Sequence, residues 1–245
     1  MYPPPRFLLR TRWSERLVSS LWRRWARGVL NRYSIQRRFD RLMLCDMQEP
    51  VGRAMITKGL WEFRQFEFLE RELRARKGDR KTVFLDIGAY WGLYSLYFER
   101  LGLFDALHAF EPSPRNQVLL DAHLQMNGLE DAIEVHRVAI SDKPGSLAIT
   151  EFGGGSRVRE GDGAIPALPL DDVLELADCL LVIKIDVEGH EARVLDGMRS
   201  TLARNKVLMQ IESFPENKDA VFAKLEDMGM SEIGFVPPDD YVFAN

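Results

Sequence analysis

The sequence predicts an α/β fold, in which parallel strands form a doubly wound sheet with helices on both faces, preceded by a basic helical extension. From Thr82 onward, short apolar runs alternate with segments of helical period, a pattern typical of a parallel sheet covered on both faces. Four of the five runs lead directly into an acidic residue. The length of 245 residues suits one large domain with an extension.

The extension differs sharply in charge from the rest of the chain. We expect residues 1–60 to form a basic, Arg- and Trp-rich helical segment, and residues 61–245 to form the main domain. Residues 1–41 contain eleven Arg against two acidic residues, a net charge of +9, whereas the remainder carries −13. An amphipathic helix is predicted because apolar residues recur every four positions, with arginines between them, at Trp13, Leu17, Leu21 and Trp25.

This amphipathic helix has three readings. It could pack on its own domain or on a second copy of the chain in a homo-oligomer. Residues 6–41 could instead contact an anionic membrane surface, with tryptophans at the headgroup boundary and arginines on the phosphates. Nucleic acid is not expected as a partner, because the acidic remainder of the chain would repel its backbone.

The elements that follow are read from the period of the apolar residues. Residues 46–76 are predicted as helices with a break at Gly59, and residues 143–169 as a loop or hairpin insertion before a helix near Asp171. The predicted strands are 83–85, 106–110, 133–138, 180–185 and 207–211, and the predicted helices are 93–101, 114–126, 191–203 and 217–228.

Composition excludes several classes of protein. No window approaches about 18 uninterrupted apolar residues, so a transmembrane helix is not expected. The start of the chain has only a three-residue apolar run at 7–9, too short for a secretory signal. Cys45 and Cys179 lack the spacing of a disulfide framework or a thiolate zinc site. We therefore expect a reducing, cytoplasmic location, with contact to the inner face of the membrane if the basic helix binds lipid.

Four acids follow predicted strands: Asp86, Glu111, Asp186 and Glu212. A single acid at such a position can simply stabilise the start of a helix. Four of them would share one edge of the sheet, at the carboxyl ends of the strands, where open α/β sheets bind ligands. The sequence therefore favours a binding site at this edge.

The first of these turns, residues 86–92, indicates the kind of ligand. It has the pattern DxGxxxG, in which Gly88 lets a ligand approach the backbone and Gly92 permits tight helix packing. It departs from the dinucleotide pattern GxGxxG at two places, because Asp86 replaces the first glycine and Trp91 stands where the last glycine would be needed. A carboxylate there would repel a pyrophosphate but attract the sulfonium and ammonium groups of S-adenosylmethionine.

Two further positions suit the rest of that cofactor. Glu111, just before Pro112, is placed for the ribose hydroxyls, because an ionised carboxylate accepts several hydrogen bonds. Residues 139–142 would line the adenine, with Asp142 accepting from the exocyclic amine, although the same residues also read as an ordinary turn.

A second cluster of ionisable residues leaves the fourth strand: Lys184, Asp186, Glu188 and His190. A hydroxyl that accepts a methyl group loses its proton, so a base within hydrogen-bond reach is expected. Glu188 and His190 are the candidates, and the sequence does not distinguish them. Asp186 with Glu188 or Glu212 could instead hold one Mg²⁺, a less favoured reading.

Taken together, these motifs resemble those of the FkbM family of S-adenosylmethionine-dependent methyltransferases. The resemblance spans roughly residues 49–212, and the matching segments are 59–62, 84–89 with Gly92, 109–114, 127–129, 139–143 and 183–191. It implies a class I methyltransferase fold, a Rossmann-like sheet of seven strands in the order 3-2-1-4-5-7-6, with the last two strands near 231–235 and 241–243. It also implies O-methylation, frequently of sugar hydroxyls in polysaccharides, glycolipids or natural products.

The chain departs from the family in two places. Tyr90 stands where the family commonly has Asn, and Trp91 stands where a small or aliphatic residue is usual. The first 41 residues lie outside the resemblance. We expect the cofactor to be held by Asp86, Gly88, Ala89, Tyr90, Gly92, Glu111, Pro112, Ala139, Asp142 and Asp186, and the chemistry to be carried by Lys184, Asp186, Glu188 and His190.

The resulting hypothesis is an O-methyltransferase whose partner is a glycan or a small molecule with a free hydroxyl. Two alternatives remain open. One is a methyltransferase that acts on RNA or protein, and the other is a non-catalytic scaffold that keeps the fold.

Overall fold

The computed structural model describes residues 32–59, 61–152, 155–160 and 163–245. The predicted amphipathic helix over residues 13–25 lies outside this part of the chain. Two compact units divide between Phe63 and Arg64, and each is described by itself.

The first unit contains a hairpin where the sequence analysis predicts helix. Strands β1 (Tyr33–Arg38) and β2 (Arg41–Asp46) pair antiparallel, and α2 (Pro50–Thr57) follows. The helical prediction is therefore wrong over residues 33–46. Its physical reason is the two-residue turn, in which Phe39 and Asp40 both adopt positive φ (50° and 59°), the backbone that joins tightly paired strands. Alternating exposure along β1 shows the period of a strand.

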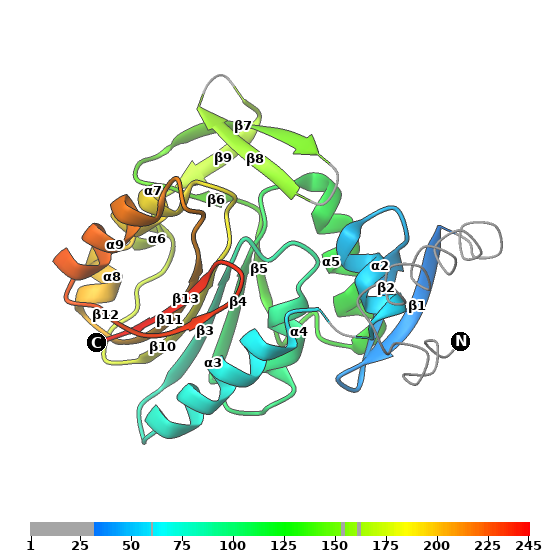
Figure 1. Cartoon of the computed structure of the whole chain (residues 1–245), viewed down its shortest axis with the longest axis horizontal. Coiled ribbons are helices and arrows are strands. Elements are labelled where there is room, and N and C mark those ends of the chain that lie inside the picture. Colours follow the sequence, from blue (N-terminus) through cyan, green and yellow to red (C-terminus); the bar gives the residue numbers. More distant parts are fainter. Residues whose placement is uncertain (1–31, 60, 153–154, 161–162) are drawn as a thin grey trace, which may run out of the picture. The chain divides into compact units, whose positions relative to one another are not determined.

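The second unit contains a seven-stranded mixed sheet (Figure 1). Its spatial order is β12-β13-β11-β10-β3-β4-β5, which reads 3-2-1-4-5-7-6 when the strands are numbered along the chain. All neighbours from β11 to β5 pair parallel, whereas β13 pairs antiparallel with both β11 and β12. The strands are β3 (Thr82–Ile87), β4 (Ala106–Phe110), β5 (Glu134–His136), β10 (Leu180–Ile185), β11 (Lys206–Glu212), β12 (Ser231–Val236) and β13 (Asp240–Ala244).

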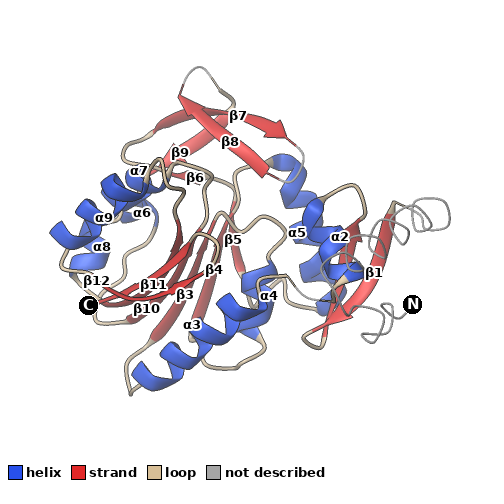
Figure 2. Cartoon of the chain, viewed as in Figure 1, coloured by secondary structure: helices blue, strands red, loops and turns tan. Residues whose placement is uncertain are grey.

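Helices cover both faces of this sheet (Figure 2). On one face, the ring of Phe66 in α3 stacks on that of Tyr97 and meets that of Phe98 edge-on, both in α4. On the other face, buried aliphatic residues such as Ile183 and Val194 form one continuous core. The first face carries α3 (Phe63–Arg76), α4 (Leu93–Glu99) and α5 (Pro114–Asn127); the second carries α6 (Leu170–Val173), α7 (Glu191–Asp196), α8 (Arg199–Ala203) and α9 (Lys218–Asp227).

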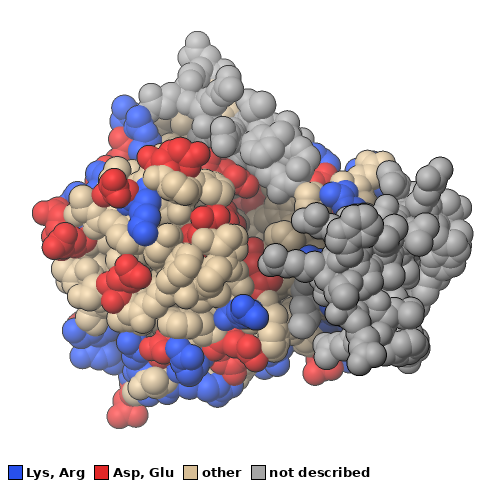
Figure 3. All heavy atoms as spheres, in the orientation of Figure 1, with Lys and Arg blue, Asp and Glu red and all other residues tan. Residues whose placement is uncertain are grey.

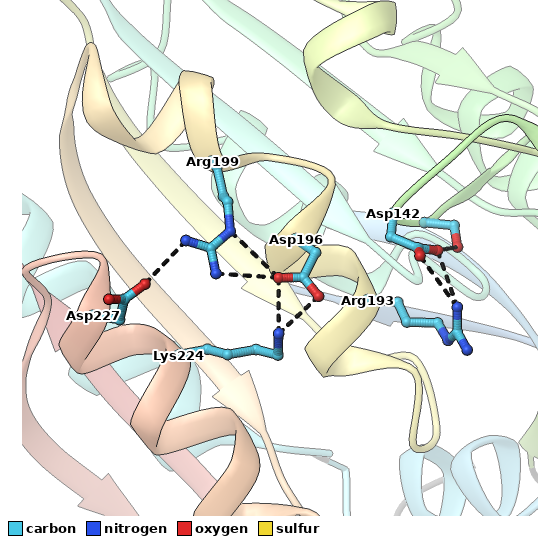
Figure 4. Close-up of polar contacts among 7 residues, drawn as sticks. Asp142, Arg193, Asp196, Arg199, Lys224 and Asp227 are labelled. Carbon is cyan, nitrogen blue, oxygen red and sulfur yellow. Dashed lines mark hydrogen bonds and ion pairs between the residues drawn. The ribbon is translucent and has the colours of Figure 1, made fainter.

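The helix predicted over 191–203 is wrong as a single element, because it breaks at Gly197 into α7 and α8. A Cβ at Gly197 would lie 1.9 Å from the carbonyl oxygen of Ser141, so only glycine allows this close approach. A new helix then begins, and the carboxylate of Asp171 accepts hydrogen bonds from the N–H groups of Ser200 (2.9 Å) and Thr201 (2.8 Å) in its first turn. Arg199 and Lys224 both bind Asp196 and so link α7, α8 and α9 (Figure 4).

The insertion predicted over 143–169 is confirmed as a small second sheet. Its order is β6-β9-β7-β8, built from β6 (Ala139–Ile140), β7 (Gly145–Phe152), β8 (Gly155–Glu160) and β9 (Ile165–Leu168). It lies on the side of the large sheet toward which the parallel strands point their carboxyl ends (Figure 1). The predicted strand over 133–138 is shorter in the structure, because the Ile133 N–H donates to the Leu129 carbonyl in the turn after α5.

None of the helices in the described part of the chain has the length and hydropathy of a membrane span.

The role of Asp171 can be tested by its removal. We expect Asp171→Ala to lower the free energy of unfolding by about 1 kcal/mol, because two N–H groups of α8 lose their acceptor. Chemical denaturation followed by circular dichroism measures this loss. Asp172→Ala, at the exposed neighbouring position, is the control and should unfold like the unaltered chain. Equal loss in both variants would contradict the capping role.

Candidate active site

Three of the four predicted acids meet at one edge, and the fourth lies just below it. Ile87 is in register with Phe110 and with Ile185, and Ile185 with Ile211, so the residues that come next, Glu111, Asp186 and Glu212, lie at the same level. Asp86 belongs to β3 itself and is in register with Lys184. Acidic side chains gather in the upper part of the face that Figure 3 shows, where Figure 1 places these strand ends. The four acids nevertheless have different surroundings.

Glu111 is a nearly buried carboxylate that links two loops. Its Oε2 accepts the N–H of Tyr90 (2.7 Å), and its Oε1 accepts the N–H of Ser113 (2.7 Å) and the amide of Asn116 (3.3 Å). Burial raises the pKa of Glu111 to about 7, against the lowering effect of these hydrogen bonds. The acid after β4 therefore fixes the glycine loop after β3.

Asp86 faces inward rather than toward a ligand. It is 1% exposed, and its Oδ2 accepts both the N–H (3.0 Å) and the hydroxyl (2.6 Å) of Ser95 in the first turn of α4. Burial raises the pKa of Asp86 to about 6, although the Ser95 bonds and the charge of Lys184 lower it. In this structure Asp86 holds the start of α4, and any effect on a cofactor acts through that helix.

The two glycines of the first loop serve the protein's own packing. Gly88 has φ +84°, and a Cβ there would lie 1.8 Å from the carbonyl oxygen of Asp186, so this glycine admits the end of β10 rather than a ligand. Gly92 has φ +78°, and a Cβ there would meet the side chain of Leu120 in α5, the tight packing that the sequence predicts. The N–H groups of Gly88 and Ala89 both donate to the carbonyl of Phe110 (3.0 Å each).

Lys184 lies in a buried polar network beneath this edge. Its ammonium donates to Asp240 Oδ1 (3.0 Å) and lies 3.9 Å from Asp186 Oδ2. Asp240 also accepts from Gln65 (3.0 Å) and Gln210 (2.8 Å). Burial alone would raise the pKa of Asp240, but Lys184 and the two amides together lower it below its usual value. With 2% exposure, Lys184 supplies charge to its neighbours rather than contact to a substrate.

Asp186 and Glu212 form a carboxyl pair at the centre of the edge. Burial, the charge of Asp186 and a hydrogen bond with Asp186 together raise the pKa of Glu212 to about 10. The two carboxyl groups are therefore joined by a hydrogen bond and hold a proton between them, and the side chain of Asp186 is 30% exposed. A cation near this pair would be stabilised by it. Lys184 already supplies positive charge 3.9 Å from Asp186.

His190 belongs to a second group of polar residues, which it forms with Ser141, Asp142 and Arg193. Its Nε2 lies 3.0 Å from the hydroxyl oxygen of Ser141, which also donates to Asp142 (3.1 Å). Asp142 pairs with Arg193 (3.2 Å; Figure 4). Burial works to raise the pKa of Asp142, yet the bonds from Ser141 and Arg193 lower it overall. Between the two groups, Glu188 adopts φ 54° and is partly exposed.

The remaining predicted contacts are spread along the loops. Ala139 is buried in β6, and Pro112 is partly exposed beside Glu111. Tyr90, with φ 54°, stacks its ring on that of Trp91 (centroids 4.7 Å apart). Trp91 is buried, and its carbonyl lies 2.7 Å from Nδ1 of His123, so this unusual residue belongs to the core.

Sequence analysis missed Asp240, Gln210 and Ser95 as members of the site. Asp240 begins β13 and pairs in register with Glu212, so an antiparallel last strand brings its first residue to the carboxyl edge. Gln210 precedes Glu212 by two positions and shares the side of β11 on which Lys184 lies in β10. The alternation of side chains along each strand predicts these placements once the neighbouring strands are known.

Three buried side-chain oxygens at this edge have no hydrogen-bond partner among the described residues. They are Gln210 Oε1, in β11, Ser213 Oγ, after β11, and Glu191 Oε2, at the start of α7. Buried polar atoms of this kind normally have a partner, so a bound polar molecule would satisfy them. The edge therefore fits a polar ligand with cationic character, held among acids and hydroxyls.

A doubly wound sheet with a polar, acidic carboxyl edge defines a cofactor-binding α/β domain. The family described as the methyltransferase FkbM domain matches residues 86–235, and the chain belongs to this family. No curated protein matches the chain.

Several solved structures are similar to the chain. A methyltransferase FkbM from Methylobacillus flagellatus is 20% identical with a TM-score of 0.49, and the match covers 68% of this chain but only 43% of that protein. The chain thus spans less than half of that relative's length. The N-terminal domain of human METTL16, in complex with S-adenosylhomocysteine, is 15% identical over 93% of this chain and 80% of its own, with a TM-score of 0.48. A ribosomal protein L11 methylase from Lactobacillus delbrueckii is 13% identical over 77% of this chain and 81% of its own, with a TM-score of 0.46.

The carboxyl pair makes stability depend on pH. The pKa of Glu212 is raised from 4.5 to about 10 on folding, so its contribution is complete at low pH and is lost as the pH rises through about 10. Asp86 and Glu111 act in the same direction, but their folded pKa values of about 6 and about 7 confine their effect to lower pH. Between about pH 7.5 and about pH 9.5 we therefore expect the free energy of unfolding to fall by at most about 1.4 kcal/mol per pH unit.

Glu212→Gln should flatten this slope, because glutamine still donates to Asp186 and does not titrate. Thermal melts across this pH window measure it. Glu226→Gln, exposed on α9, is the matched control and should keep the original slope. If Glu212→Gln and the unaltered chain lose stability at the same rate, Glu212 does not hold the proton.

Proposed function

We propose that this chain is an S-adenosylmethionine-dependent O-methyltransferase that acts on a hydroxyl group, with a sugar hydroxyl of a polysaccharide, glycolipid or natural product as acceptor. The observation that carries the proposal is the Asp186–Glu212 carboxyl pair, placed at the carboxyl edge of a methyltransferase-family sheet beside the first glycine loop. The resemblance in the loop motifs supports a sugar acceptor. The net charge of −13 outside residues 1–41 supports a non-nucleic-acid acceptor.

The donor set of the edge fits this cofactor. Glu111 would hold the ribose hydroxyls, Asp142 the adenine amine, and the Asp186–Glu212 pair the cationic end, since carboxylates stabilise positive charge. When bound, S-adenosylmethionine supplies an electrophilic methyl group on a sulfonium that leaves as a neutral thioether. Asp86 and Gly88 would act indirectly. Asp86 fixes the start of α4, and Gly88 lets the end of β10 approach the loop closely.

Asp186 is the proton acceptor in this proposal. Its carboxyl group is partly exposed and hydrogen-bonded to Glu212, whose pKa is raised, so it can orient the acceptor hydroxyl and take its proton as the new C–O bond forms. Lys184, at 3.9 Å, stabilises negative charge on Asp186. Glu188 and His190, which follow Asp186 in the same loop, would position the acceptor. Alignment of the reacting atoms supplies the larger share of the acceleration, roughly 7 to 11 kcal/mol.

Cofactor binding is the first test. We expect isothermal titration to show binding of S-adenosylmethionine and S-adenosylhomocysteine in the micromolar range, with no binding of NAD. Glu111→Ala should weaken binding by at least about 10-fold, because the ribose contacts are lost. Glu130→Ala, exposed after α5, is the control. A folded chain that binds NAD and neither adenosyl ligand would contradict the proposal.

The base is tested by release of S-adenosylhomocysteine with a panel of glycans, small alcohols and RNA. We expect turnover with a hydroxyl acceptor to fall by at least about 100-fold in Asp186→Asn and by less than about 10-fold in Glu212→Gln. Cofactor titration of Asp186→Asn separates lost chemistry from lost binding. Glu216→Gln, in the exposed turn after β11, is the matched control.

Two results would change the assignment. If Glu188→Gln or His190→Gln abolishes turnover while Asp186→Asn stays active, the base lies on the loop instead. If RNA alone supports turnover, the acceptor class is wrong.

A further inference from the structure

A group of two histidines and one glutamate lies outside the acidic edge. His108 is on β4, and Glu134 and His136 are on β5, the last strand of the large sheet. His108 pairs in register with Glu134, and Phe110 with His136. Because side chains alternate along a strand, all three point to the same face. Within the described part of the chain, His108, Glu134 and His136 form the one group of three His, Cys, Asp or Glu residues whose ligand atoms all lie within 4.8 Å of one another.

The distances within this group are those of a metal's ligand shell. Nδ1 of His108 lies 3.1 Å from Nε2 of His136 and 3.3 Å from Oε2 of Glu134, and His136 Nε2 lies 3.6 Å from Glu134 Oε1. Four ligands at about 2.0 to 2.1 Å around a tetrahedral Zn²⁺ lie about 3.3 Å from one another. The three side chains therefore converge on one point without rearrangement of the backbone.

The exposure of the three side chains also suits a metal ion. The histidine side chains are 10% and 13% exposed, whereas that of Glu134 is 64% exposed, so an ion can enter from the solvent side.

We propose that His108, Glu134 and His136 form a binding site for a divalent first-row transition metal ion, with Zn²⁺ as its occupant. Two imidazoles and one carboxylate are an established ligand set for this ion, and the fourth position opens to solvent on the side of Glu134. The site is independent of the carboxyl pair and of the proposed methyl transfer.

Two short connections link the proposed metal site to the loops that are predicted to hold the cofactor. The ring of His136 stacks on that of Phe110 (centroids 4.5 Å apart), and the Phe110 carbonyl accepts both loop N–H groups, of Gly88 and Ala89. The carbonyl of His136 accepts the N–H of Glu111 (3.1 Å). The ion would thus fasten the three-residue edge strand β5 to β4 and steady the loops that β4 and β5 lead into.

The test is metal binding to the full, tag-free chain after removal of metal. We expect stoichiometric binding of Zn²⁺ by isothermal titration, and visible absorption typical of tetrahedral Co²⁺ when Co²⁺ replaces it. Glu134→Gln should weaken Zn²⁺ binding by at least about 10-fold, and His136→Phe, which keeps a ring against Phe110, should abolish it. Glu130→Gln is the matched control, an exposed glutamate four positions earlier, and should bind like the unaltered chain.

Binding of Zn²⁺ that is equal in Glu134→Gln and in the control would overturn the proposal, as would the absence of stoichiometric binding in the unaltered chain. In either case the two histidines form only a hydrogen bond. If His136→Phe does not fold, the surface variant Glu134→Gln decides the question. Failure of methyl transfer would leave these readouts unaffected, because they measure the metal alone.

Discussion

The buried ammonium of Lys184 is the charge on which the active edge depends. It lies in the central strand pair with three carboxyl groups around it, on Asp86, Asp186 and Asp240, and its ion pair with Asp240 joins β10 to β13. Without it, three acids would lie together in a region of low dielectric with no positive charge between them. The lysine lowers the pKa of both Asp86 and Asp240 against the effect of burial. The antiparallel strand β13 is needed to bring Asp240 within reach.

Much of the fold could be predicted from local sequence, because buried parallel strands read as uninterrupted apolar runs. The runs at 106–110 and 180–185 coincide with β4 and β10. The division of α7 from α8 could not be predicted from local sequence, because it depends on the carbonyl of Ser141, which is distant along the chain. The hairpin β1–β2 was missed because its turn uses Phe39 and Asp40 instead of a recognisable Asn-Gly pair.

The sequence predicts which acids gather at the candidate site better than it predicts what each of them does there. The convergence of Glu111, Asp186 and Glu212 follows from strand ends alone, and the structure confirms it, whereas Asp86 lies two positions earlier, within β3. Which acid turns inward does not follow, because alternation gives the face of a side chain but not what covers that face. Ser95 covers Asp86, whereas Asp186 remains partly exposed. Asp240 and the histidines of β4 and β5 went unnoticed for a related reason: each matters only beside a residue from another strand.

The carbonyl of Phe110 limits how this scaffold could be redesigned. Dinucleotide-binding sheets use free backbone N–H groups in the first glycine loop to hold a pyrophosphate. Here the Gly88 and Ala89 N–H groups are already paired within the protein. Replacing Asp86 and Trp91 with glycine would restore the letters of the dinucleotide motif GxGxxG without freeing those donors. The hydrogen bonding of β4 therefore affects cofactor preference as much as the loop sequence does. Conversion to nicotinamide binding would require a different path of the chain after Phe110.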